Sequence, residues 1–146
     1  MSNVPEAFAT TLHIRDHCLC LHAQRAARAL ARRFDDAFRP FGITSGQFSL
    51  MNGLNRPSPP RIGAVAELLA MDRSTVTAAL KPLERAGWVS VSVDATDRRS
   101  RRLALTDAGR AVLAETTPVW IREHAVVEAE LPGTGDALRT GLRALT

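Results

Sequence analysis

The segment from Ile62 to Leu105 constrains the fold more than any other part of the chain, because the spacing of its apolar residues changes within it. Apolar residues first recur at three and four, which predicts a short helix over 62–69 and a second helix after Asp72. Only Ala70–Asp72 separates the two helices, and short helices joined by so tight a turn outline a helix-turn-helix. The buried stripe of the second helix is expected at Val76, Ala79, Leu80 and Leu83.

Beyond Gly87 the apolar period changes to two, which is typical of a half-buried strand. Valines alternate with serines over 89–93, and Leu103 and Leu105 alternate around Ala104 on a return strand. The connecting loop, 94–102, ends with four arginines in five positions. The sequence therefore predicts a β-hairpin with a strongly basic tip directly after the second helix.

Two further helices are expected before this segment. Apolar spacing predicts one long helix over 12–38, ended by the proline and glycine that follow it. Thr44 and Gln47 have the pattern of a capping box, in which the threonine oxygen accepts from the amide of the glutamine and the glutamine side chain reaches back. The helix that starts there is expected to continue to a proline-rich loop at 55–60.

Two more helices are expected at the carboxyl end. Thr106 caps a helix that runs to about Leu131, and 138–145 form a short amphipathic helix with leucines on one side. Helices this short cannot bury such wide apolar faces alone, so they are expected to pack on each other and on a second copy. The expected fold class is mainly α with a small β wing.

The charge of the chain is compatible with a nucleic-acid partner. Its formal net charge is +4, and its basic residues are eighteen arginines and the single Lys81. Arginine presents a planar fork that suits phosphate oxygens and guanine edges. A high-GC genome would produce the same excess of arginine over lysine, so charge alone leaves both explanations open.

The sequence contains no run of 18 or more apolar residues, so no membrane span is expected. Charged residues interrupt the first twenty positions, which is unlike a secretory signal. The expected location is the cytoplasm.

The second helix of the helix-turn-helix presents small hydroxyls and cations on the side opposite its buried stripe. Such a face near a helix N-terminus suits the major groove of DNA, because the free amides and the helix dipole favour phosphate while the side chains reach base edges. Taken alone, such a face is more often an ordinary solvated helix face. Its combination with a basic hairpin is rarer and predicts double-stranded DNA as the partner. The residues expected to bind DNA are Arg73, Ser74, Thr75, Thr77, Lys81, Arg98, Arg99 and Arg101.

Several segments together resemble the MarR family of winged-helix regulators. They are Val65–Thr77 (VAELLAMDRSTVT), Leu83–Val89 (LERAGWV), Asp97–Arg99 (DRR), Leu103–Gly109 (LALTDAG) and Gly42–Leu50 (GITSGQFSL). The resemblance covers the chain from about Leu12 to Leu145. It implies a winged helix-turn-helix lobe over 44–106, with 1–43 and 107–146 forming a dimerisation region.

The same resemblance implies how such a chain works. A homodimer, held by the first, fifth and sixth helices, binds a palindromic operator, and a small-molecule effector occupies a pocket between the dimer helices and the DNA-binding lobe. Asp97 braces the wing and Arg99 enters the minor groove. The candidate pocket residues, of which the aromatic ones and the methionine could equally be core, are His22, Phe41, Phe48 and Met51.

Two cysteines, Cys18 and Cys20, suggest a second kind of input. Cys20 stands 24 residues before Thr44, which resembles the spacing in the organic-hydroperoxide-sensing branch of the family. That branch holds its thiol with tyrosines, and this chain has none. Two interpretations stay open. Cys20 is a candidate redox sensor, with Cys18 beside it, or both cysteines are small apolar residues in a helix core. On one helix the two would point about 200° apart, too far for a disulfide without unwinding.

No metal, cofactor or catalytic residue is expected. His13, His17 and Cys20 share a helical stripe, but three ligands on one helix rarely close a zinc site without a fourth from elsewhere. No nucleophile or dinucleotide motif survives inspection, so the chain is not expected to be an enzyme. We expect a sequence-specific transcriptional regulator, a repressor released by a small ligand or an oxidant. The alternative is an architectural, sequence-tolerant DNA-binding protein without an effector.

Overall fold

The computed structural model describes residues 5–146, apart from the side chain of Ala7. Two compact units make up the chain, one that ends at Arg33 and one that comprises Phe34–Thr146, and each is described by itself. The expected division at residue 43 depends on which helices a second copy would cover, so it stays a prediction. No helix within the described residues is both long and apolar enough to cross a membrane.

Two helices occupy the amino-terminal part of the chain, where one was expected. Helix α1 spans Glu6–His17 and helix α2 spans Leu19–Phe38, with Cys18 extended between them at φ −68° and ψ 110°. The expectation of one unbroken helix over 12–38 is therefore wrong. The Cys18 sulfur accepts a hydrogen bond from the Leu21 amide (3.4 Å), so it takes the place of a helix cap at the start of α2.

The second unit begins with the end of α2, the short 3₁₀ turn η1 (Arg39–Phe41) and helix α3 (Ser45–Leu54). The capping box at Thr44 is confirmed: its Oγ1 accepts from the Gln47 amide (3.1 Å), and Gln47 Oε1 accepts from the Thr44 amide (3.0 Å). These two bonds satisfy two amide groups that a helix start otherwise leaves without partners.

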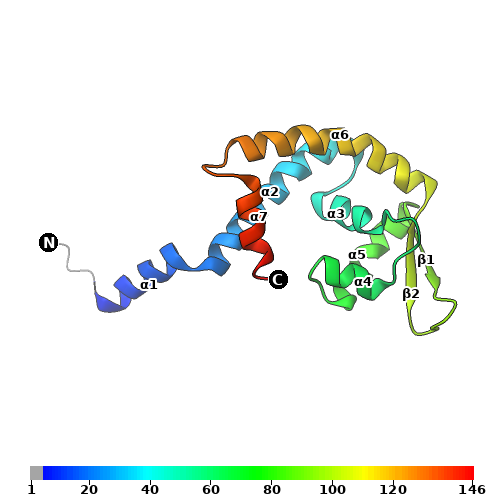
Figure 1. Ribbon diagram of the computed structural model, residues 1–146, viewed down its shortest axis with the longest axis horizontal. Coiled ribbons are helices and arrows are strands. Elements are labelled where there is room, and N and C mark those ends of the chain that lie inside the picture. The colour runs from blue at the N-terminus through cyan, green and yellow to red at the C-terminus, as the bar shows by residue number, and fades with distance from the viewer. Residues whose placement is uncertain (1–4) are drawn as a thin grey trace. The chain divides into compact units, whose positions relative to one another are not determined.

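Helix α4 (Ile62–Leu68) and helix α5 (Arg73–Arg85) form the expected helix-turn-helix (Figure 1). The turn uses Ala70 in the left-handed region, at φ 51°. The Ala70 amide donates to the Glu67 carbonyl (3.1 Å) and the Met71 amide to the Ala66 carbonyl (2.9 Å), which is the Schellman pattern of helix ends. Asp72 precedes α5 as expected, but its side chain makes no capping hydrogen bond.

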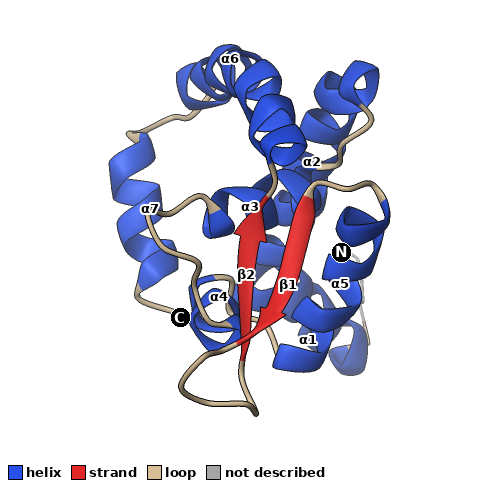
Figure 2. Cartoon of the chain, turned by 90° about the vertical axis from the view of Figure 1, so that its right-hand side faces the viewer, coloured by secondary structure: helices blue, strands red, loops and turns tan. Residues whose placement is uncertain are grey.

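The hairpin consists of β1 (Val89–Val93) and β2 (Arg101–Leu105), paired antiparallel with Val89 opposite Leu105. Figure 2 shows its loop projecting beyond the neighbouring helices. The alternation predicted for β1 holds from Val89 to Ser92 and fails at the end of the strand. Val89 is buried and Val91 half-buried against the core, while Val93 is 54 % exposed. On the other side of β2, the Leu103 amide donates to the Pro60 carbonyl (3.0 Å), so the loop before α4 lies along the hairpin.

Helices α6 (Asp107–Ala129) and α7 (Gly135–Arg143) complete the chain. Thr106 caps α6 as expected, and its hydroxyl also donates to the Gly87 carbonyl (2.6 Å), which ties the start of α6 to the end of α5. Most of the core lies under the helix-turn-helix and the hairpin. Its fully buried side chains are Phe38, Met51, Val65, Val76, Leu83, Leu103 and Thr116.

Candidate nucleic-acid interface

Helix α5 presents a polar face because its large apolar residues point inward. Val76, Leu80 and Leu83 are at most 2 % exposed. Every residue of α5 that was expected to bind DNA is exposed. The Thr77 hydroxyl donates to the Arg73 carbonyl one turn earlier (2.9 Å), so its oxygen and methyl group remain available to a ligand, but its proton is engaged.

Arg73 is placed differently from the other polar residues of α5. A Cβ atom added to Gly63 would lie 2.9 Å from a guanidinium nitrogen of Arg73. The head of Arg73 therefore rests against the first turn of α4. From there it offers a positive charge beside the first turn of α4, which suits a phosphate oxygen.

The wing carries its arginines at the tip of the hairpin. Within residues 5–146, the side chains of Arg98 and Arg99 are exposed and make no hydrogen bond or ion pair. Arg101 instead turns back, donating through Nη1 to the carbonyls of Arg98 (3.2 Å) and Ser100 (3.4 Å). Of the three wing arginines that the sequence predicts to bind DNA, Arg98 and Arg99 are thus exposed to solvent and available to DNA.

Asp97 holds the backbone beneath those arginines. Its carboxylate accepts from the Arg99 amide (3.0 Å), and its carbonyl accepts from the Ser100 amide (3.0 Å). The brace is local, because both bonds stay inside the turn. It orders the tip without tying the wing to any other element.

The wing is tied to another element by a different carboxylate, the buried Asp94, which the sequence did not predict. Asp94 is 4 % exposed and accepts from Arg102 Nε (2.6 Å), Arg61 Nη2 (3.0 Å), Thr96 Oγ1 (2.9 Å) and the Asp97 amide (3.1 Å). The hydrogen bond from Arg102, with smaller help from Thr96 and the charge of Arg61, lowers the pKa of Asp94 from 3.8 to about 2, against the opposing effect of burial. The only signal in the sequence was an acidic residue at the start of a basic loop.

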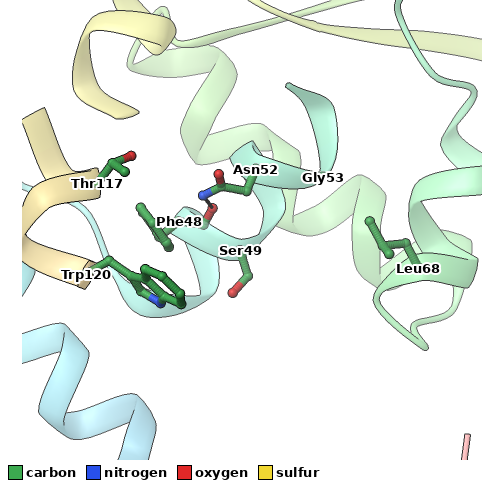
Figure 3. A pocket seen from close by; sticks show the side chains of 7 residues that line it. All are labelled: Phe48, Ser49, Asn52, Gly53, Leu68, Thr117 and Trp120. Atoms are coloured by element: carbon green, nitrogen blue, oxygen red, sulfur yellow. Dashed lines mark hydrogen bonds between the residues drawn. The ribbon is translucent and has the colours of Figure 1, made fainter. Parts of the chain in front are cut away.

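A pocket of about 490 Å³ lies between α3, α4 and α6 (Figure 3). It is lined by Phe48, Ser49, Asn52, Gly53, Leu68, Thr117 and Trp120. The rings of Phe48 and Trp120 lie 6.5 Å apart, and Trp120 stacks on His124 at 4.5 Å. The lining is thus mainly aromatic and aliphatic, with an amide and hydroxyls but no charged side chain.

Of the four pocket residues expected from the sequence, only Phe48 lines this pocket. Met51 is fully buried in the core, and Phe41 is half-buried against it. His22 lies on α2 in the other unit, where it lines a separate surface hollow with arginines. The aromatic residue that sequence reasoning missed is Trp120, whose helix was considered only for dimerisation.

The cysteines do not share a helix, contrary to the geometry considered above. Cys18 lies at the break and Cys20 in the first turn of α2, where it is exposed and accepts from Gln24 Nε2 (3.2 Å). The break also separates Cys20 from His13 and His17, which stack at 4.1 Å. No cluster of three or more potential metal ligands occurs in the described part of the chain.

A model of the MarR family matches residues 43–100, which include α3 to α5, β1 and most of the wing loop. Among proteins of known function, the transcriptional regulator PecS of Dickeya dadantii is 29 % identical over 125 residues, covering 83 % of this chain and 73 % of PecS.

Solved structures give the same picture for the whole fold. The M. tuberculosis transcriptional regulator MosR, in complex with DNA, is 33 % identical with a TM-score of 0.81, and the match covers 88 % of this chain and 93 % of MosR. The transcriptional repressor CouR, bound to a 23-mer DNA duplex, is 28 % identical with a TM-score of 0.72, over 90 % and 92 % of the two chains.

Proposed function

The chain belongs to the MarR family of DNA-binding transcriptional regulators, and we propose that it is a homodimeric repressor that leaves a palindromic operator when a small ligand or an oxidant reaches it. The observation that carries the proposal is the pairing of two exposed elements on one unit, the polar face of α5 and the arginine tip of the wing. Such a protein acts on the chromosome, and the location that goes with this proposal is the cytoplasm.

The two exposed elements suit different grooves. The hydroxyls and cations of α5 fit the major groove, where base edges can be distinguished. Arg98 and Arg99 fit the narrow, electronegative minor groove beside it. MosR and CouR, both similar to this chain over most of its length, were each solved with DNA, which supports this assignment.

A second copy would cover apolar surface that the single chain leaves in water. Leu138, Leu142 and Leu145 of the carboxyl end are 46–65 % exposed, as are Ile121 (56 %) and Val126 (47 %) of α6. These exposed residues support a dimerisation region formed by 1–43 and 107–146, separate from the DNA-binding lobe at 44–106. A twofold dimer presents two recognition helices about 34 Å apart and so calls for an inverted repeat.

Repression follows if the dimer blocks access to a promoter while it occupies its operator. CouR, the relative described as a repressor, supports this direction of control. The pocket of Phe48 and Trp120 offers the effector site. Because its polar lining consists of hydroxyls and an amide, it suits a small, largely apolar aromatic molecule better than one whose charge needs a cation.

An oxidant is the alternative input, favoured by the position of Cys20. Its side chain is exposed, and its sulfur accepts a hydrogen bond from Gln24 Nε2. In its thiolate form the sulfur would attack one oxygen of a hydroperoxide. The O–O bond breaks, the sulfur gives up two electrons to become a sulfenic acid, and the other oxygen leaves as an alcohol.

Selection of bound duplexes from a random pool, with reduced and with peroxide-treated protein, tests the proposed function. We expect one inverted-repeat site from reduced protein. If Cys20 is the sensor, mild hydroperoxide releases that DNA from the wild type and from Cys18→Ser but not from Cys20→Ser. Release of DNA from Cys20→Ser, or no release from the wild type, would rule out Cys20 as the sensor and leave a ligand in the pocket as the input. Enrichment of no sequence, with a steep salt dependence, would contradict the regulator and favour an architectural protein.

A further inference from the structure

We propose that Asp94 is a positioning residue for DNA binding, which sets the direction of the wing by tying it to the loop that precedes α4. The proposal rests on the proposed function, because it concerns how the wing reaches DNA. In this scheme the Arg99 side chain contacts DNA directly. Asp94 makes no contact with DNA and acts by holding the wing that carries Arg99.

The carboxylate joins two segments that are distant in sequence. Arg61, at the start of α4, is 33 residues from Asp94 and donates through the same nitrogen to Asp94 (3.0 Å) and to Thr96 (3.2 Å). Arg102, on β2, donates to Asp94 through Nε (2.6 Å) and to the Pro59 carbonyl through Nη1 (2.9 Å). One buried carboxylate thus links both strands of the hairpin to the loop that starts the helix-turn-helix.

Apolar packing does not hold this part of the wing. Val93, next to Asp94, is 54 % exposed, and the loop beyond it projects past the helices (Figure 2). Within the described residues, the polar cluster of Asp94, Thr96, Arg61 and Arg102 is therefore the hydrogen-bonded contact closest to the tip that connects the wing to another element. Its loss would leave the tip braced internally by Asp97 but freer to swing at its base.

Electrostatics alone predicts the opposite effect of removing this carboxylate. Asp94→Asn raises the formal net charge from +4 to +5 and releases two arginines from their ion pairs, which should strengthen attraction to phosphate. A positioning role predicts weaker binding instead, because the wing arginines no longer arrive in a fixed direction. The sign of the change in affinity separates the two explanations.

The test compares Asp94→Asn with Glu84→Gln in the full-length protein. Glu84 is an exposed residue of α5, so its substitution makes the same change in charge without removing the anchor. Affinity for the selected operator duplex is measured at several salt concentrations. We expect Asp94→Asn to weaken binding by about tenfold, the scale of one well-placed contact, and Glu84→Gln to bind as tightly as the wild type or more tightly.

Combination with Arg99→Ala shows whether Asp94 acts through the wing. If it does, Asp94→Asn has little further effect once the Arg99 side chain is gone, so the two losses are not additive. If Asp94→Asn does not unfold cooperatively on heating, Arg102→Lys takes its place. Arg102 reaches Asp94 through Nε and the Pro59 carbonyl through Nη1, whereas lysine keeps the charge but offers a single nitrogen.

Unchanged or tighter binding by a folded anchor variant, or losses that add fully with Arg99→Ala, would overturn the positioning role and leave the proposed function intact. If the wild type prefers no duplex at all, the proposed function fails first, and the role of Asp94 in it fails with it. Three results together support the proposal. Asp94→Asn binds the operator more weakly than the wild type, its loss of affinity does not add to that of Arg99→Ala, and Glu84→Gln binds at least as tightly as the wild type.

Discussion

Two residues with left-handed backbones end the two helices of the helix-turn-helix, and they differ in what that conformation costs. Gly87, after α5, has φ 76° and carries no Cβ, so it adopts this region without strain. Ala70, after α4, has φ 51° and makes the same pair of helix-ending hydrogen bonds. An alanine there costs about 1 kcal/mol relative to glycine.

We therefore expect Ala70→Gly to raise the free energy of unfolding by up to about 1 kcal/mol, less the greater entropy that glycine gives the unfolded chain. The matched change Gly87→Ala should lower it by a similar amount, since a Cβ there meets open space but an unfavourable φ. Urea unfolding of both variants measures the difference. A loss of stability in Ala70→Gly would show that the left-handed turn is not maintained in solution.

Within the DNA-binding surface, substitutions should separate affinity from sequence preference. Arg99→Ala should weaken binding to all duplexes and flatten the dependence of affinity on salt, because a wing arginine acts on phosphate and minor-groove potential. Thr77→Val keeps the methyl group but removes the hydroxyl, so it should change the preferred bases with a smaller loss of overall affinity. Titrations of matched and mismatched duplexes at two salt concentrations measure both. Unchanged affinity in Arg99→Ala would mean that the wing does not reach DNA.

Residues whose partners lie within one helical turn were predictable from the sequence. The capping box at Thr44 and the helix cap at Thr106 each depend on an amide three residues further along the chain, and both form as expected. The cap at Asp72 does not form, and the cap at Cys18 was missed because sulfur is an uncommon acceptor at a helix start. The role of Asp94 depends on Arg61, far away in sequence, and no local pattern encodes such a contact.

At the level of elements, the wing should respond to acid through its anchor. The pKa of Asp94 is lowered from 3.8 to about 2 in the folded chain, so its contribution to stability is complete above about pH 4. It is lost as the pH falls through about 2, where the folded carboxyl takes up its proton. The stability difference between wild type and Asp94→Asn should therefore shrink between pH 4 and pH 2. Urea unfolding at steps of pH measures it, and a constant difference over that range would show that the ion pairs do not form.

The change of apolar period located the helix-turn-helix and the hairpin, because each element buries one face against the same core. The same pattern failed in two places. Apolar spacing continues across Cys18, so the break between α1 and α2 has no periodic signature. The valines of β1 alternate to the end of the strand although its packing stops before Val93, since nothing in a strand's own pattern says where its covering layer stops.

For the whole molecule, several large apolar side chains of α6 and of the carboxyl end are exposed to solvent. The leucines at its carboxyl end were visible in the sequence, and the structure shows them in water. The pocket of Phe48 and Trp120 was predictable only through Phe48, because Trp120 comes from a helix that is distant in sequence. Which part of the chain a second copy covers depends on that copy, so it stays a prediction.

The central proposal, a homodimer that reads two half-sites on one face of DNA, is tested most directly by changing the spacing of the selected operator. Inserting five base pairs turns one half-site by about half a turn away from its recognition helix. We expect affinity to fall by about a hundredfold or more, to the level of a duplex with one half-site. Sedimentation of the same samples should show one dimer on each intact operator. Equal affinity at both spacings, or full binding by a monomer, would contradict the account.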